Sequence, residues 1–312
     1  MNVDLSPEAI EFGVAARRAF EAAGGDDLLQ RAEVDPTARE ALAGPVLADL
    51  GAWDLEPAQD ADSLEAAAAL CRSAGYWALP YPVAERLAVP TGLDADGLLV
   101  VSSTRPSAAI GGLEGRWIAV ASDGTRHRVT GVSDPGPAFV STLDLEPLDA
   151  DGISDLPLAL TLPCWTLLGM LDRAIDLTIA HVQMRQQFGQ PLARFQSVQF
   201  QLTDAEVERA GLDVLAKYTL WSVGTGSPDA LDDALALRMA ALEAAEIVFR
   251  VTHQLHGAVG FCDETTLSWL SRYSQPPRRL PFGLSATRDQ LTARIDRRGL
   301  AGLYTPEREA AR

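Results

Sequence analysis

The chain has 312 residues, of which 47% are hydrophobic and 22% charged. This is the balance of an ordinary soluble globular protein, long enough to bury a large core without disulfides. Its 26 Lys and Arg residues against 43 Asp and Glu give a formal net charge of −17, which repels nucleic acid and anionic membranes and disfavours both as partners.

Cysteine usage and the first residues favour a cytoplasmic protein. There are three cysteines, an odd number, and no pair has a metal-ligand or redox spacing. The segment Met1–Phe12 lacks the basic start and apolar stretch of a signal peptide. No uncharged apolar run reaches the length needed to cross a bilayer.

Residues 1–90 have the patterns of helices. Ser6 is a good N-cap residue, and Pro7 suits the first helical position. Three helices are expected: one from Pro7, one over Pro36–Leu50 ended by Gly51, and one over Ser63–Ala74 ended by Gly75.

Residues 91–150 change to short β-rich runs separated by turn dipeptides such as Asp123-Gly124. We expect a reduced antiparallel sheet of about four strands. The expected strands are Leu98–Ser102, Arg116–Ala121, His127–Val132 and Ala138–Leu145.

Residues 151–312 return to helical patterns with short connections, which predicts an antiparallel helical bundle. The expected helices are Leu162–Phe188, Phe195–Val223, Asp229–Val259, Glu264–Arg272 and Ser285–Arg298. The sequence therefore predicts a mainly α protein with three parts: an N-terminal helical domain, a middle sheet and a C-terminal bundle.

The first notable motif joins two bundle helices and reads Arg-Gln-Gln-Phe-Gly-Gln-Pro-Leu over 185–192, then Arg-Phe-Gln over 194–196. We expect the long helix to end at Gly189, with Arg185 one turn earlier, where a cation suits the helix dipole. Taken alone, this motif is also compatible with a purely structural corner between two helices.

The second motif follows the third bundle helix and reads Gln-Leu-His-Gly-Ala-Val-Gly-Phe over 254–261. Glycines spaced in this way let the backbone approach another chain or a cofactor closely. A helix end with two cap glycines explains the segment equally well. His253 and His256 share a helix face, but no third ligand is apparent, so we expect no metal site.

In this order and at this separation, the two motifs resemble those of the acyl-CoA dehydrogenase family. That family carries Arg-x-Gln-Phe-Gly-x-Pro-x-x-x-Phe-Gln between two bundle helices and Gln-x-x-Gly-Gly-x-Gly after the third. The matching residues are Arg185, Gln187, Phe188, Gly189, Pro191, Phe195, Gln196, Gln254, Gly257 and Gly260, while Ala258 stands where the family usually has a second glycine.

The resemblance implies that the chain handles FAD across a subunit interface. In the family, both motifs contact the ADP part of a flavin held by the neighbouring subunit. The residues implied here are Arg185, Phe188, Gln196, Gln254, Gly257 and Gly260. The chemistry suits them, because an Arg fork matches pyrophosphate oxygens and an aromatic ring can pack against adenine.

Two departures from the family pattern concern the flavin ring and the catalytic base. Trp117-Ile118-Ala119 lacks the hydroxyl of the family's flavin-ring segment, and Trp117 is more simply a sheet residue. Acyl-CoA dehydrogenation needs a carboxylate at the α-carbon of the acyl thioester. Phe282 and Ala159 occupy the two positions at which the family usually places that Glu, so no catalytic residue is assigned.

The retained and missing parts together indicate that the chain is the divergent subunit of a heteromeric acyl-CoA dehydrogenase. We expect a homologous partner subunit to hold the flavin ring and the Glu, as in enzymes of bacterial sterol side-chain breakdown, with an electron-transfer flavoprotein as a possible acceptor. Two alternatives stay open: a self-sufficient dehydrogenase with an unusual base, and a non-catalytic assembly or regulatory protein of the same fold.

Overall fold

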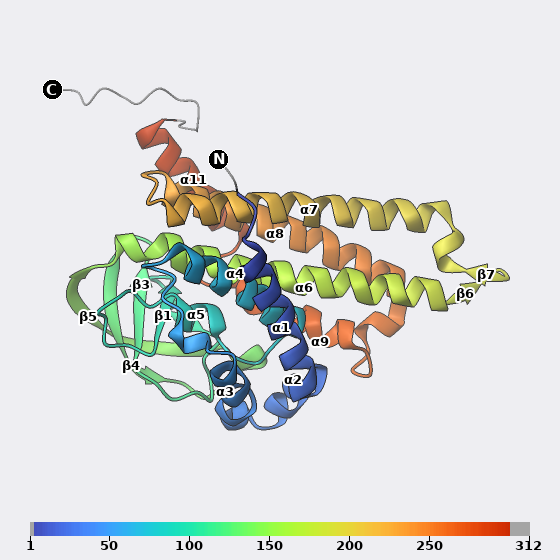
Figure 1. The fold of residues 1–312 in the computed structure, drawn as a ribbon, viewed down its shortest axis with the longest axis horizontal. Coiled ribbons are helices and arrows are strands. Elements are labelled where there is room, and N and C mark those ends of the chain that lie inside the picture. Colours follow the sequence, from blue (N-terminus) through green and yellow to red (C-terminus); the bar gives the residue numbers. More distant parts are fainter. Residues whose placement is uncertain (1–2, 300–312) are drawn as a thin grey trace.

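The structure is a computed structural model that describes residues 3–299. Helices come first, a small sheet follows, and long helices complete the chain (Figure 1). The sheet lies at one end of the molecule, and the long helices run side by side to the other end. This confirms the mainly helical class and the predicted order of its three parts.

The helices before the sheet include two that the sequence patterns do not predict, α2 and α5. The five are α1 (Pro7–Ala23), α2 (Asp26–Val34), α3 (Arg39–Asp49), α4 (Ala61–Tyr76) and α5 (Val83–Leu87). The Ser6 side chain accepts a hydrogen bond from the backbone N–H of Ala9, which confirms the predicted cap of α1. Pro36 begins a 3₁₀ turn that leads into α3, so the expected helix from Pro36 begins slightly later.

The sheet has five strands, and one of its pairings differs from the prediction. The strands are β1 (Gly97–Val101), β2 (Ser107–Ala108), β3 (Trp117–Ala121), β4 (Thr125–Val132) and β5 (Ser141–Asp151), in the order β1-β3-β4-β5-β2. β1 and β3 are parallel, with Gly97 opposite Trp117, whereas the other pairs are antiparallel. The purely antiparallel sheet was therefore a wrong prediction.

The connection between β1 and β3 explains the parallel pair. This connection contains β2, which pairs with β5 at the opposite edge of the sheet. The chain thus crosses the sheet before it returns beside β1, and such crossovers allow two strands to run in the same direction. β3 is buried at all five residues, as expected for a strand covered on both faces.

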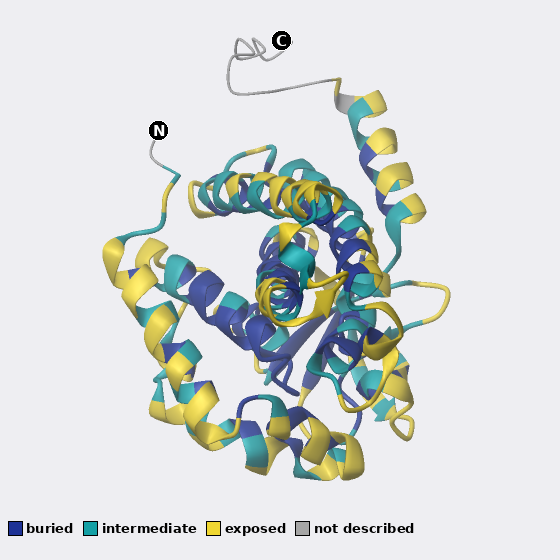
Figure 2. Ribbon diagram, turned by 90° about the vertical axis from the view of Figure 1, so that its right-hand side faces the viewer, coloured by how far each residue is buried: buried dark blue, intermediate teal, exposed yellow. Residues whose placement is uncertain are grey.

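The C-terminal helices form the predicted bundle. They are α6 (Leu156–Met184), α7 (Gln196–Gly224), α8 (Ala230–His256), α9 (Thr266–Tyr273), α10 (Gln275–Arg279) and α11 (Leu284–Arg298). Buried residues gather around the centre of the molecule when it is viewed along the bundle (Figure 2). α6 contributes many of the buried residues.

Among residues 3–299, one helix is long and apolar enough to cross a membrane by length and composition alone. It covers Ile153–Met184, and 72% of its most apolar window is buried inside the protein. Leu162, Trp165 and Leu168 have essentially no exposed surface. The apolar character of this helix is thus accounted for by its place in the core.

α4 and α6 cross at two glycines that replace side chains with backbone contact. A Cβ atom at Gly75 would lie 1.9 Å from the carbonyl oxygen of Thr166, and one at Gly169 would lie 1.8 Å from that of Arg72. Gly75 therefore lies within α4 and does not end it, which corrects the predicted helix end. This close crossing attaches the N-terminal helices to the bundle.

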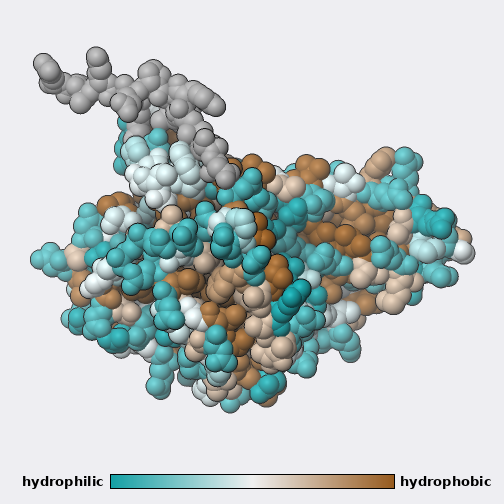
Figure 3. All heavy atoms as spheres, in the orientation of Figure 1, coloured by the Kyte–Doolittle hydropathy of each residue, from teal (hydrophilic) through white to brown (hydrophobic). Residues whose placement is uncertain are grey.

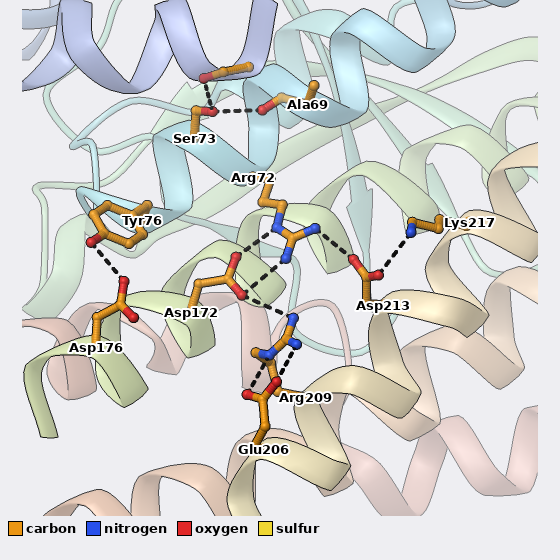
Figure 4. Close-up of polar contacts among 11 residues, drawn as sticks. Ala69, Arg72, Ser73, Tyr76, Asp172, Asp176, Glu206, Arg209, Asp213 and Lys217 are labelled. Atoms are coloured by element: carbon orange, nitrogen blue, oxygen red, sulfur yellow. Dashed lines mark hydrogen bonds and ion pairs between the residues drawn. The ribbon is translucent and has the colours of Figure 1, made fainter. Parts of the chain in front are cut away.

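Charged side chains reinforce the same crossing (Figure 4). The Arg72 guanidinium on α4 lies 2.6 Å from Asp172 on α6 and 2.6 Å from Asp213 on α7. Arg209 also reaches Asp172, at 3.4 Å, and Lys217 reaches Asp213, at 3.1 Å. Because these groups are largely shielded from solvent and share partners, they connect three helices as one network.

Candidate functional site

The first motif forms a hairpin and not the predicted helix corner. α6 ends at Met184, and two short strands, β6 (Gln186–Gln187) and β7 (Gln190–Pro191), follow it. Phe188 and Gly189 have φ of 54° and 80°. Two successive residues with positive φ form the turn that joins a two-residue β-hairpin. The helix therefore ends at Met184, five residues before its predicted end at Gly189.

The hairpin projects from the far end of the bundle (Figure 1) and presents both an aromatic ring and a cation. Phe188 is 92% exposed, and its ring makes an edge contact with Phe195 at 6.2 Å between centroids. Arg185 is exposed, and among the described residues its guanidinium has no carboxylate partner. These are the two side chains for which the sequence predicts contact with an ADP group.

The second motif lies where α8 ends. Gln254 is exposed in the last turn of the helix, and the segment Gly257–Phe261 continues as a 3₁₀ turn. Gly257 is exposed, and a Cβ there would meet no atom within 4 Å. Gly260 is buried, and a Cβ there would lie 2.8 Å from the Cβ of His256. Gly257 therefore faces open space, whereas Gly260 serves the packing of the turn.

A pair of histidines brings the two motifs to the same end of the bundle. The rings of His181 on α6 and His256 on α8 stack at 4.3 Å between centroids. The carbonyl of His181 accepts a hydrogen bond from the backbone N–H of Arg185. Burial and the nearby Arg185 guanidinium lower the pKa of His181. Burial and the neighbouring histidines lower that of His256, which favours neutral rings that can stack.

Gln196 begins α7, after the 3₁₀ turn Leu192–Arg194 that follows the hairpin, and it is exposed. The described structure thus places all six predicted cofactor-binding residues at or beside the free end of the bundle. The exposed side-chain amides of Gln196 and Gln254 and the Arg185 guanidinium are the kind of donors that pyrophosphate oxygens need, and an exposed phenyl ring can pack on adenine. The residues present therefore fit the ADP part of FAD.

An apolar stripe along α7 leads from this end of the bundle. Phe200, Val207 and Val214 recur every seven residues and are 59%, 63% and 62% exposed. Apolar surface gathers over this part of the bundle in Figure 3. Large apolar side chains repeated at heptad spacing are typical of a helix face that packs against another helix.

The two positions expected for a catalytic Glu carry no acid, and Phe282 is partly buried against the core. Ala159 is buried in the first turns of α6. Phe282 stands directly before α11, and its carbonyl accepts a hydrogen bond from the buried Arg238 side chain at 2.7 Å. Trp117 is buried in β3 and packs on Gly97, as expected for a sheet residue.

A cavity of about 140 Å³ lies where the N-terminal helices, the sheet and the bundle meet. Its lining includes Ala159 and also Leu280 and Pro281, the residues directly before Phe282. The two expected base positions therefore belong to the surroundings of one cavity. Three charged residues line it, Arg39, Glu85 and Arg238.

Arg39 holds one wall of this cavity in place. It is 2% exposed, and its guanidinium donates to the carbonyl oxygens of Pro80, Gly111 and Ala109 at 2.8, 2.6 and 3.0 Å. Burial lowers its pKa to about 9, which still leaves it charged at neutral pH. No sequence pattern marked Arg39 or Glu85, because neither residue belongs to either of the two motifs.

A family model matches the C-terminal part of the chain, and curated relatives match parts of it. Residues 161–280 match the family model described as acyl-CoA dehydrogenase, C-terminal domain. Acyl-CoA dehydrogenase FadE28 of Mycobacterium tuberculosis is 30% identical over 150 residues, 46% of this chain and 44% of that protein. Acyl-CoA dehydrogenase FadE27 of the same organism is 28% identical over 225 residues, which are 66% of this chain and 57% of that protein. The chain thus spans about half the length of these curated relatives.

Solved structures extend the likeness to nearly the whole chain. A variant of the Tcur3481–Tcur3483 steroid ACAD superposes with a TM-score of 0.77 at 21% identity, over 93% of this chain and 98% of that chain. The ChsE4–ChsE5 complex from Mycobacterium tuberculosis superposes with a TM-score of 0.76 at 15% identity, over 96% of this chain and 100% of that chain. Residues 161–280 therefore match the C-terminal domain of acyl-CoA dehydrogenases, and the described chain has the overall fold of these structures.

Proposed function

We propose that the chain is one subunit of a flavin-dependent acyl-CoA dehydrogenase, with a homologous partner that holds the flavin ring and the catalytic Glu. The observation that carries this proposal is a division within the molecule. The end of the bundle presents an unpaired Arg185 and an almost fully exposed Phe188, while Ala159 and Phe282 stand where the base is expected.

The role of this chain is to bind and orient the ADP part of the cofactor across the interface. Bound FAD supplies the hydride acceptor for α,β-dehydrogenation of an acyl-CoA thioester. Arg185 donates to pyrophosphate oxygens and stays charged at any working pH. Phe188 packs on the adenine, and the polar ends of Gln196 and Gln254 supply further hydrogen bonds, while the turn at Gly257 admits the cofactor closely.

Assembly follows from the same surface. The exposed stripe Phe200, Val207 and Val214 would be covered by a partner bundle, which would also bring the partner's flavin beside the hairpin. Two of the solved relatives are named as pairs of different subunits, Tcur3481–Tcur3483 and ChsE4–ChsE5, and this supports a mixed assembly. A role in fatty acid or sterol catabolism accords with the steroid ACAD among them.

Replacing Arg185 by Ala in the mixed complex tests the assigned contact. Hydrogen bonds to charged groups contribute about 1.5–3 kcal/mol, so we expect flavin affinity to fall about ten- to a hundredfold. Arg105→Ala is the matched control, because Arg105 is exposed in the sheet region, far along the chain from either motif, and removes the same charge. Equal flavin affinity in both variants would mean that the hairpin is only a structural connection.

A further inference from the structure

The cavity where the N-terminal helices, the sheet and the bundle meet has the size and lining of a site for one small, mainly apolar group. Its volume is about 140 Å³, and a cavity of about 150 Å³ in a protein core can hold a benzene ring. Leu79, Val83, Leu98 and Leu99 are among the aliphatic residues of the lining. Such walls favour a ring or a short branched chain over a strongly hydrated group.

One carboxylate faces this apolar space. Glu85 on α5 is the only acidic residue among the described residues that line the cavity. No hydrogen bond or ion pair joins it to another side chain in the described part of the chain. The Arg39 guanidinium lies within electrostatic range, but its three hydrogen bonds go to backbone carbonyls. Burial raises the pKa of the Glu85 carboxyl above its ordinary value.

Two further lining residues carry buried polar atoms without partners, the hydroxyl of Tyr273 and the Nε of Arg238. A buried polar atom without a hydrogen bond typically costs about 1–3 kcal/mol. The cavity therefore has unused hydrogen-bonding capacity of both kinds, an acceptor at Glu85 and a donor at Tyr273. A plain hydrocarbon ligand would leave that capacity unused.

The charges around the cavity favour a neutral group at Glu85. An anion there would be repelled by the carboxylate, and an amine, although attracted by Glu85, would be repelled by Arg39 and Arg238, which both line the cavity. A neutral hydroxyl group avoids both penalties. It can donate to the carboxylate in a charge-assisted hydrogen bond, which is stronger than a bond between neutral groups.

We propose that this cavity binds a compact apolar group that carries one hydroxyl, and that the hydroxyl donates a hydrogen bond to Glu85. Within the proposed dehydrogenase, the acyl group handled by the assembly would then bear a hydroxyl on a ring or short branch, a conclusion that rests on the proposed function. The binding site itself does not depend on flavin or on a partner.

Phenol and toluene are suitable probes, because they have nearly the same shape and differ by a hydroxyl in place of a methyl group. Each is titrated into the full chain while NMR follows the methyl signals of Leu98 and Leu99, which line the cavity. We expect phenol to bind about tenfold more tightly than toluene or better. Glu85→Leu should abolish this preference, whereas Glu114→Leu should keep it, because Glu114 is exposed and does not line the cavity.

Glu85→Gln provides a second variant that keeps the shape and a neutral acceptor, and its preference for phenol should fall several-fold. Equal affinities in the wild-type chain, a preference that survives Glu85→Leu, or no shift of the Leu98 and Leu99 signals with either probe would overturn the proposal. Such a failure would leave the proposed function standing, because the titration uses neither flavin nor partner. Conversely, if the chain never supported flavin binding, the proposal for this cavity would be unaffected.

Discussion

The close crossing of α4 and α6 predicts a large difference between glycines that look alike in the sequence. A Cβ at Gly75 would lie 1.9 Å from a backbone oxygen, whereas ordinary contact begins at 3.4 Å. Because a backbone atom cannot rotate away, Gly75→Ala must push the two helices apart by more than an ångström. Gly211, on the exposed face of α7, has no atom within 4 Å of its hypothetical Cβ.

The magnitude follows from two opposing effects. Alanine gains about 1 kcal/mol over glycine within a helix, and Gly211→Ala should therefore raise the free energy of unfolding by up to that amount. Overpacking a core costs about 1–3 kcal/mol and sometimes more, and contact with backbone belongs at the upper end. Gly75→Ala should then lower the free energy of unfolding by about 2 kcal/mol.

Urea unfolding of the two variants and the wild type measures this difference directly through the midpoint at constant slope. The double variant Gly75→Ala/Gly169→Ala should lose less than the sum of the two single losses, because both substitutions separate the same pair of helices. If Gly75→Ala proved as stable as Gly211→Ala, the described crossing of α4 and α6 would be wrong.

Two further predictions concern pH. The pKa values of His181 and His256 are lowered in the folded chain, so the unfolded chain binds more protons and the free energy of unfolding should fall as the pH drops below about 6.5. Between pH 7.5 and 5.5, urea unfolding should show a smaller fall for His181→Phe than for the wild type. An equal fall in both would refute the stacked neutral pair. The pKa of Glu85 is raised, so its ionised form opposes folding above about pH 4.5. In urea unfolding, Glu85→Gln should therefore be more stable than the wild type at pH 7 and should lose that advantage below about pH 4.5. An equal effect of the substitution at both pH values would contradict the raised pKa of this carboxyl.

The long helices could be predicted from sequence because helical periodicity, Pro and Gly mark them over many residues. Local patterns failed where a few residues decide the conformation. Phe188 adopts a positive φ that a phenylalanine rarely takes, so the hairpin after Met184 looked like a continuing helix. The parallel pairing of β1 with β3 depends on the pairing of β2 with β5, in which Ser107 lies opposite Thr142 and Ala108 opposite Ser141. No short-range sequence signal records a pairing between such distant residues.

The residues of the candidate site also fall into a group that the sequence reveals and a group that only the structure reveals. Arg185, Phe188 and Gln254 were found because they belong to contiguous motifs. Glu85 and Tyr273 lie 188 residues apart in the chain and meet only because α5, α6 and α9 pack around one cavity. Single residues that tertiary packing brings together leave no periodicity and no spacing to detect, so the cavity required the structure.

The flavin-to-chain ratio, measured by absorbance before and after assembly with the homologous partner subunit, tests the central claim most directly. We predict that the isolated chain retains little FAD and does not oxidise acyl-CoA with an artificial electron acceptor. The assembly should hold about one FAD for each pair of unlike chains and should turn over. Full flavin occupancy together with turnover in the isolated chain would contradict the proposed division of labour between the two subunits.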